Sequence, residues 1–323
     1  MKKLNVLLLP IRSLDIPWCE NIRNEIGHRH NLKVLDENQS LTPQFKGVDV
    51  VIDHGGSVGT REMMDAAIDC KLWQILGTGF DHFDLNYIKS KGIPTANTPG
   101  QFSDVALAET AMMFILMLTR NFQESAKNFK KGLLYTPLGF ELENQTLGVI
   151  GFGASGQALA RRAKAFGMKI MGIDVRTIDS EIIQEIQPTF MGKPDDLDQV
   201  VAESDFLSLH LHLNDDTRHI INARRLNLMK PTASIINVAR GALVDEKALY
   251  RTLVDQKIGG AGLDVFAQEP PDPSLPVYRL SNVIATPHVA GVTDGTARRR
   301  AITASENTDR IALGLEPLYR IDL

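Results

Sequence analysis

The chain has 323 residues, which fits two domains of about 100–200 residues each. With 43% hydrophobic and 23% charged residues, its composition is typical of a globular protein and excludes a disordered or fibrous one. A net charge of −4 argues against nucleic acid or an anionic membrane as a partner, and no apolar run approaches the ~20 residues of a membrane span.

The first hundred residues alternate short apolar runs with helical periodicity. The opening MKKLNVLLLP is too short for a signal peptide and predicts a strand instead. We expect strands at 5–9, 48–52 and 72–76, and helices at 18–26, 61–67 and 85–91. A turn is predicted at Asn-Thr-Pro-Gly, residues 97–100, and a long apolar helix at 103–120.

A second alternating series begins at Thr146. It predicts strands at 147–150, 169–173, 206–210, 234–238, 261–265 and 283–285, and a final helix at 293–313. The whole pattern indicates an α/β fold with two Rossmann-like or flavodoxin-like domains and mainly parallel sheets. We place one domain at 1–99 plus 295–323 and the other at 100–294, with an interdomain cleft as the ligand site.

A glycine-rich motif opens the second series. Gly151, Gly153 and Gly156 match GxGxxG between a strand and a helix, where they allow a tight turn, close approach of a pyrophosphate and close helix packing. N–H groups at the helix start, around Ala154 and Ser155, would bind the phosphates. Three glycines alone can be purely structural. Here the complete strand–helix–strand unit is present, so we expect a dinucleotide.

The residues that end the next strand bear on which dinucleotide binds. Asp174 would accept hydrogen bonds from the adenosine ribose, and its carboxylate favours NAD over NADP, because it would repel a 2′-phosphate. Arg176 lies close by in the sequence and leaves that preference open. The domain at 100–294 is therefore the expected NAD-binding domain, and the other is the expected substrate-binding domain.

Three later segments each follow a predicted strand: NVARG (237–241), GLDVFAQEP (262–270) and TPHVAG (286–291). Reduction of a 2-keto acid needs a cation for the carboxylate, a proton donor for the carbonyl oxygen and a group that keeps this donor charged. Ligands gather at the carboxyl ends of parallel strands, so these segments are the candidates to supply all three.

With GTGFDHFD (77–84) and NTPG (97–100), these motifs resemble in order the D-isomer-specific 2-hydroxyacid dehydrogenase family. This family includes phosphoglycerate dehydrogenase, glyoxylate/hydroxypyruvate reductase and D-lactate dehydrogenase, and the resemblance covers nearly the whole chain. It implies NAD-dependent hydride transfer at C2 of a small 2-hydroxy or 2-keto acid, without a metal. It also implies a homodimer, with residues 121–142 as an arm.

The resemblance assigns a role to individual residues. His288 would be the acid in reduction and the base in oxidation, since an unperturbed imidazole pKa of about 6.5 suits both. Glu269 would pair with His288 and favour the imidazolium, while Arg240 would bind the substrate carboxylate together with backbone N–H groups at Thr78 and Gly79. The further expected cofactor contacts are Asp264 at the nicotinamide carboxamide, His210 and His212 in the adenine pocket, and Val238, Ala239 and Gly291.

The sequence also departs from the family pattern. Ser155 replaces a bulky aliphatic residue, and His212 replaces a proline. The loops at 53–56 and 76–78 carry no Arg or Lys, which favours a non-phosphorylated substrate. Three alternatives are a D-3-phosphoglycerate dehydrogenase, an NAD(H)-sensing corepressor-like binding protein and an L-lactate or malate dehydrogenase. The order of Arg240, Glu269 and His288 argues against the last.

The two cysteines bear on the compartment. Cys19 and Cys70 lie far apart and outside any CxxC pattern. A disulfide between them is an alternative, but two separate thiols in a reducing compartment fit better, so we expect a cytoplasmic protein.

Overall fold

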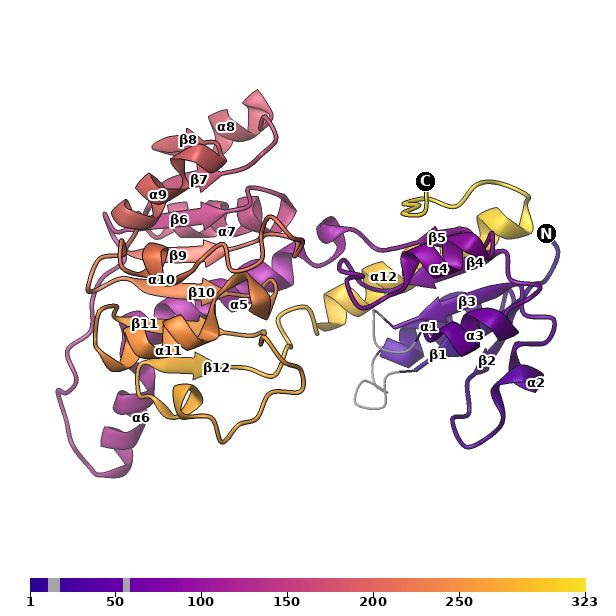
Figure 1. Cartoon of the computed structure of the whole chain (residues 1–323), viewed down its shortest axis with the longest axis horizontal. Helices are drawn as coiled ribbons and strands as arrows, with labels where there is room; N and C mark the ends of the chain where they lie inside the picture. The colour runs from indigo at the N-terminus through magenta and orange to yellow at the C-terminus, as the bar shows by residue number, and fades with distance from the viewer. Residues whose placement is uncertain (11–17, 55–58) are drawn as a thin grey trace. The chain divides into compact units, whose positions relative to one another are not determined.

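The computed structural model describes residues 1–10, 18–54 and 59–323. It divides into two compact units (Figure 1), one formed by Met1–Ser103 with Val292–Leu323 and the other by Asp104–Gly291. The sequence-based boundaries, at 99/100 and 294/295, lie within a few residues of these junctions. Both units are α/β with parallel sheets, as the sequence predicts.

In the described residues of the first unit, parallel strands form a sheet in the order β2-β1-β3-β4-β5. Their bounds are β1 (Asn5–Leu9), β2 (Asn31–Val34), β3 (Val50–Asp53), β4 (Leu72–Ile75) and β5 (Thr95–Ala96). The sheet is covered on both faces, and β1 shows why. Val6 and Leu8 point into one buried core, whereas Leu7 and Leu9 point into the other.

The helices of the first unit divide between these two cores. The core containing Val6 also includes residues of α1 (Glu20–Ile26) and α12 (Asp294–Ala312). The opposite core includes residues of α2 (Leu41–Phe45), α3 (Arg61–Ala66) and α4 (Leu85–Ser90). A short 3-10 turn, η3 (Gly100–Phe102), precedes the second unit. The carboxyl-terminal helix α12 is thus an integral part of the first unit.

The second unit has an all-parallel sheet in the order β12-β11-β10-β9-β6-β7-β8, visible as a stack in Figure 1. The strands are β6 (Thr146–Ile150), β7 (Lys169–Ile173), β8 (Phe190–Gly192), β9 (Phe206–Leu209), β10 (Ser234–Asn237), β11 (Gly260–Leu263) and β12 (Val283–Ala285). The strand order reverses at β6, between β7 and β9. In open α/β sheets a ligand binds at the carboxyl ends of the strands flanking such a reversal.

Helices cover both faces of this sheet. One buried core includes residues of α5 (Asp104–Thr119), α7 (Ala154–Ala165) and α8 (Ser180–Ile186). The other includes residues of α9 (Leu197–Glu203), α10 (Ala223–Leu226) and α11 (Glu246–Val254). Helix α6 (Phe122–Lys130) follows α5, and short 3-10 turns are η4 (Pro194–Asp196), η5 (Gly241–Leu243) and η6 (Pro276–Arg279). Within the described ranges no single helix is long and apolar enough to cross a membrane; only the bent pair α5–α6 meets that criterion jointly.

Candidate functional site

The glycine motif forms the turn between β6 and α7. Gly151 has φ +93°, and a Cβ there would lie 2.4 Å from the carbonyl oxygen of His210. A Cβ on Gly156 would lie 2.2 Å from the carbonyl oxygen of Gly151. These two glycines are required by the packing of the chain itself.

Gly153 is different from the other two glycines. A Cβ there would meet only the exposed Arg176 side chain, at 3.4 Å from its Nη2. The packing of the chain therefore leaves this position open to a closely approaching ligand. Gly153 is also the N-cap of α7, which has no side-chain cap, so the first N–H groups of the helix remain for an anion. This turn fits the pyrophosphate of a dinucleotide.

Ser155, the departure from the family pattern, is tied to the end of β9. The ring of His210 lies between two hydroxyls, with Nδ1 at 3.0 Å from Ser155 Oγ and Nε2 at 2.9 Å from Ser208 Oγ. Burial lowers the pKa of His210 to about 4, so the ring is neutral at physiological pH. Ser155 thus links the glycine turn to the end of β9 by a hydrogen bond, where the family's bulky aliphatic residue would make only apolar contacts.

Asp174 directly follows β7 and is 6% exposed. Its Oδ1 accepts hydrogen bonds from the backbone N–H of Arg176 (2.8 Å) and from Arg176 Nε (3.0 Å), and its Oδ2 accepts one from Nη2 (3.1 Å). Burial pushes the pKa of Asp174 up, but the hydrogen bonds and charge of Arg176 outweigh it and hold that pKa below its ordinary value. The carboxylate that could accept ribose hydroxyls is therefore ionised and paired.

The segment carrying Arg240 is in backbone contact with the segment that leads to Glu269. A Cβ on Gly241 would lie 1.9 Å from the carbonyl carbon of Phe266, so only glycine permits this approach. Asn237 shapes the turn, since its side chain donates to the Arg240 carbonyl (2.9 Å) and accepts from the N–H of Ala239 (3.1 Å). Val238 and Ala239 are buried in the same turn.

His288 and Glu269 form a direct pair, with Nδ1 of the ring 2.8 Å from Oε2 of the carboxylate. Glu269 is oriented by the backbone N–H of Phe266, which donates to Oε1 at 3.1 Å. Burial raises the pKa of Glu269, but the hydrogen bond and charge of His288, with a contribution from Arg240, hold it below its ordinary value. The His288 side chain is 46% exposed, so its ring is open to a substrate. The structure therefore brings the expected acid–base pair together.

Asp264 has a supporting role in addition to the one expected. It is fully buried, and its carboxylate accepts hydrogen bonds from Thr286 Oγ1 (2.6 Å), the N–H of Val289 (2.9 Å) and the N–H of Ala290 (2.8 Å). Burial raises the pKa of Asp264, although these hydrogen bonds oppose the rise. His288, between these groups, has φ 55°, a left-handed conformation that costs a histidine roughly 1–3 kcal/mol. Asp264 thus stabilises the turn that presents His288.

The substrate residues expected in the other domain lie in the first unit. Thr78 and Gly79 follow β4 and are half-buried. Thr78 Oγ1 donates to the Thr98 carbonyl at 3.2 Å, and Asn97 Nδ2 donates to the Thr78 carbonyl at 3.0 Å. These hydrogen bonds connect the loop to the segment at Asn97 and Thr98. Gly55 and Gly56, in the loop after β3, lie outside the described residues.

Sequence reasoning missed Arg300, because that residue lies far along the chain from this loop. Arg300 belongs to α12, and its Nη1 donates to the Leu76 carbonyl at 2.8 Å. Its guanidinium also lies 5.5 Å from the ring centroid of Trp18, in a cation–π contact. The loops after β3 and β4 carry no Lys or Arg of their own at 53–56 and 76–78, but the packing of α12 brings Arg300 to the loop after β4.

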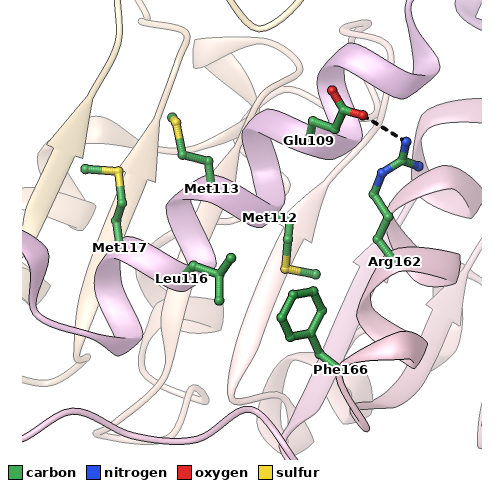
Figure 2. Close-up of a pocket in the computed structure, with 7 residues that line it drawn as sticks. All are labelled: Glu109, Met112, Met113, Leu116, Met117, Arg162 and Phe166. Atoms are coloured by element: carbon green, nitrogen blue, oxygen red, sulfur yellow. Dashed lines mark hydrogen bonds and ion pairs between the residues drawn. The ribbon is translucent and has the colours of Figure 1, made fainter.

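A hollow of about 380 Å³ lies elsewhere in the second unit (Figure 2). It is lined by Met112, Met113, Leu116 and Met117 of α5 with Arg162 and Phe166, and Glu109 pairs with Arg162 across one end at 3.2 Å. None of these residues belongs to the glycine turn or to the His288 pair. Within the described ranges no group of three or more His, Cys, Asp or Glu side chains is arranged to hold a metal ion.

Residues 112–290 match the sequence profile of the D-isomer specific 2-hydroxyacid dehydrogenase, NAD binding domain. The chain belongs to this family. It is 38% identical to hydroxypyruvate reductase of Thermotoga maritima, over 84% of this chain and 86% of that protein. It is 35% identical to D-3-phosphoglycerate dehydrogenase of Methanocaldococcus jannaschii, over 89% of this chain but only 56% of that longer protein.

A solved structure shows the same architecture. The crystal structure of D-lactate dehydrogenase from Aquifex aeolicus, complexed with NAD and lactic acid, superposes with a TM-score of 0.81. It is 30% identical in sequence, and the match covers 96% of each chain. The expectation of an NAD-dependent oxidoreductase acting on a CH–OH group is confirmed by this family membership.

Proposed function

We propose that the protein interconverts D-2-hydroxy acids and 2-keto acids, with His288 as the acid–base group. The observation that carries the proposal is the 2.8 Å pair between His288 Nδ1 and Glu269 Oε2, placed after parallel strands together with Arg240. When bound, the nicotinamide cofactor supplies or accepts the hydride at C2 of the substrate. The remaining tasks belong to residues of the chain.

In reduction, His288 donates a proton from Nε2 to the carbonyl oxygen, because Nδ1 is engaged by Glu269. In oxidation the same nitrogen accepts the hydroxyl proton, as microscopic reversibility requires. The ionised Glu269 stabilises the protonated ring by hydrogen bond and charge. We assign substrate binding to the planar guanidinium of Arg240 in the second unit and to the backbone N–H groups of Thr78 and Gly79 in the first unit.

The nucleotide contacts follow from the strand-end geometry of the second unit. We assign the pyrophosphate to the turn formed by Gly151, Gly153, Ala154, Ser155 and Gly156, and the adenosine ribose to Asp174. His210, Val238, Ala239, Asp264 and Gly291 complete the set we propose around the cofactor. By this assignment residues 100–294 form the NAD-binding domain, and residues 1–99 with 295–323 form the substrate-binding domain.

For the substrate, we propose a small non-phosphorylated 2-keto acid such as glyoxylate or hydroxypyruvate. The support is the absence of Lys and Arg in the sequence of the loops at 53–56 and 76–78. A phosphorylated acid is the second candidate, because Arg300 brings a cation to the loop after β4. Steady-state assays with NADH and either glyoxylate, hydroxypyruvate or 3-phosphohydroxypyruvate separate the two. A strong preference for the phosphorylated acid would overturn the first choice.

A protein that only senses NAD(H) would bind the nucleotide without turning over any keto acid. The pairing of an exposed histidine with an ionised glutamate next to an arginine favours the enzyme, because sensing requires no acid–base pair. NADH oxidation that depends on an added keto acid supports the enzyme. Tight NADH binding without turnover of any acid in the panel would support the sensor.

We also propose that the protein is a cytoplasmic homodimer. A second copy of this chain would cover the apolar hollow on α5 and the exposed side chains of Phe129, Leu134, Tyr135 and Leu138, which are 72–101% exposed. A monomer rarely leaves such apolar groups in water. Cys19 and Cys70 are buried thiols that form no disulfide, as is typical of a reducing compartment. Sedimentation should give twice the 35.7 kDa chain mass, and the Met113→Lys variant should sediment as a monomer.

A further inference from the structure

Asp174, the acid that follows β7, is paired with Arg176. The Arg176 guanidinium donates two hydrogen bonds to the Asp174 carboxylate, from Nε at 3.0 Å and from Nη2 at 3.1 Å. The backbone N–H of Arg176 donates to the same carboxylate at 2.8 Å. The Asp174 side chain is 6% exposed and that of Arg176 is 64% exposed. The cation therefore covers the carboxylate on its solvent side, where a nucleotide must approach.

The guanidinium also reaches the glycine turn. Its Nη2 lies 3.4 Å from the position that a Cβ on Gly153 would occupy, and among the described residues that are not neighbours of Gly153 in the chain no other group lies within 4 Å of that position. Arg176 thus lies between the turn assigned to the pyrophosphate and the acid assigned to the ribose. A phosphate on the 2′-oxygen of that ribose would be placed against this side chain.

A second cation supports the same loop. Lys193, just after β8, donates from Nζ to the carbonyl of Val175 at 3.2 Å and to that of Arg176 at 2.8 Å. These bonds fix the backbone from which Arg176 projects and add positive charge beside it. Asp196 accepts the backbone N–H of Lys193 at 2.8 Å and so caps η4, without pairing with either cation.

An isolated carboxylate at the end of this strand repels a 2′-phosphate, and a nearby arginine accommodates one. Here the carboxylate is already neutralised by the arginine, which has more N–H donors than the pair with Asp174 uses. We propose that Arg176 is a specificity-determining residue that lets the site accept the 2′-phosphorylated dinucleotide NADP(H) as well as NAD(H). This inference rests on the nucleotide site proposed above.

Binding of two adenosine fragments tests the proposal without any turnover. 5′-AMP and 2′,5′-ADP differ only in the 2′-phosphate, and calorimetry on the full chain measures both dissociation constants. We expect the wild-type protein to bind them within roughly tenfold of each other. The Arg176→Ala variant should weaken 2′,5′-ADP by roughly tenfold or more, as expected for losing a hydrogen bond to a charged group, and leave 5′-AMP nearly unchanged.

A matched control distinguishes the specific effect of losing Arg176 from the general effect of removing a surface arginine. Arg161 forms a similar two-bond pair with Glu185 in the same unit, with Nε at 2.6 Å and Nη2 at 2.7 Å from the two carboxylate oxygens. Arg161→Ala should change neither affinity. A second readout is the ratio of kcat/KM for NADPH to that for NADH, which should fall in Arg176→Ala and stay constant in Arg161→Ala.

The proposal is overturned if wild type binds 2′,5′-ADP more than roughly a hundredfold more weakly than 5′-AMP, or if Arg176→Ala weakens both fragments equally. In either case, binding of 5′-AMP would still support the assignment of the nucleotide site. If neither fragment nor NADH binds, both this inference and the assigned nucleotide site are wrong.

Discussion

Replacing Asp264 by asparagine tests how the protein holds its proton donor. The carboxylate accepts from Thr286 Oγ1, the N–H of Val289 and the N–H of Ala290, at 2.6, 2.9 and 2.8 Å. An asparagine offers one oxygen and one amide NH₂, so it leaves at least one donor, such as the buried N–H of Ala290, facing another donor. Losing a charge-assisted hydrogen bond to a buried group costs about 1.5–3 kcal/mol. The melting temperature should therefore fall by roughly 5–10 °C.

The same change should lower activity by more than the loss of stability explains. Without the carboxylate, the strained backbone of His288 at φ 55° can relax, and a displacement of about 1 Å can reduce the rate up to a hundredfold. We expect kcat/KM for the 2-keto acid to fall by roughly tenfold to a hundredfold, measured by NADH absorbance at a temperature where the variant is folded.

Asp205 provides the matched control for this experiment. Its carboxylate accepts the N–H of Thr146 at 2.8 Å and Lys230 Nζ at 2.8 Å, at the amino ends of β6 and β9, the edge of the sheet away from His288. Asp205→Asn should lower the melting temperature with kcat/KM unchanged. If Asp264→Asn lowers stability but leaves kcat/KM at the wild-type value, Asp264 does not position His288.

Further predictions concern other contacts. Because the folded pKa of His210 is about 4 and its unfolded pKa is about 6.5, the unfolded chain binds the proton first, and stability falls as pH drops from 6.5 toward 4. The loss should be about 2 kcal/mol at pH 5 in urea unfolding, and His210→Asn should remove it; an equal pH dependence in that variant would contradict the assignment. Arg300→Lys should raise KM for the keto acid severalfold without changing NADH affinity, because the substitution weakens the hydrogen bond to the Leu76 carbonyl. An unchanged KM would show that the loop after β4 does not depend on Arg300. Ser155→Ala should weaken NADH binding in fluorescence titration, and equal binding would make the hydroxyl dispensable.

The sequence predicted the architecture well because parallel strands buried on both faces appear as continuous apolar runs. It missed β2, β5 and β8 for identifiable reasons. β2 lies at an edge with Lys33 exposed between partly buried residues, β5 has only two residues, and β8 has three. None of these has the length or apolar content on which sequence-based strand prediction depends.

The candidate site was predictable where neighbouring residues act together. Glycine spacing and the segments around Arg240, Glu269 and His288 carry their own signal, and the structure brings Glu269 and His288 into contact. Contacts between distant segments were not predictable. The contact between Arg300 and the loop after β4 depends on how α12 packs. The hydrogen bonds between Arg176 and Asp174 depend on side-chain conformations that residue spacing in the sequence does not determine.

The most direct test of the proposed chemistry is the reduction of a 2-keto acid by a His288→Asn variant. Asparagine tolerates the left-handed backbone at this position, so the turn should survive while the proton donor is lost. We predict that kcat falls by roughly a hundredfold to ten-thousandfold, with the dissociation constant of NADH unchanged in fluorescence titration. Turnover at the wild-type rate by this variant would show that His288 is not the acid–base group.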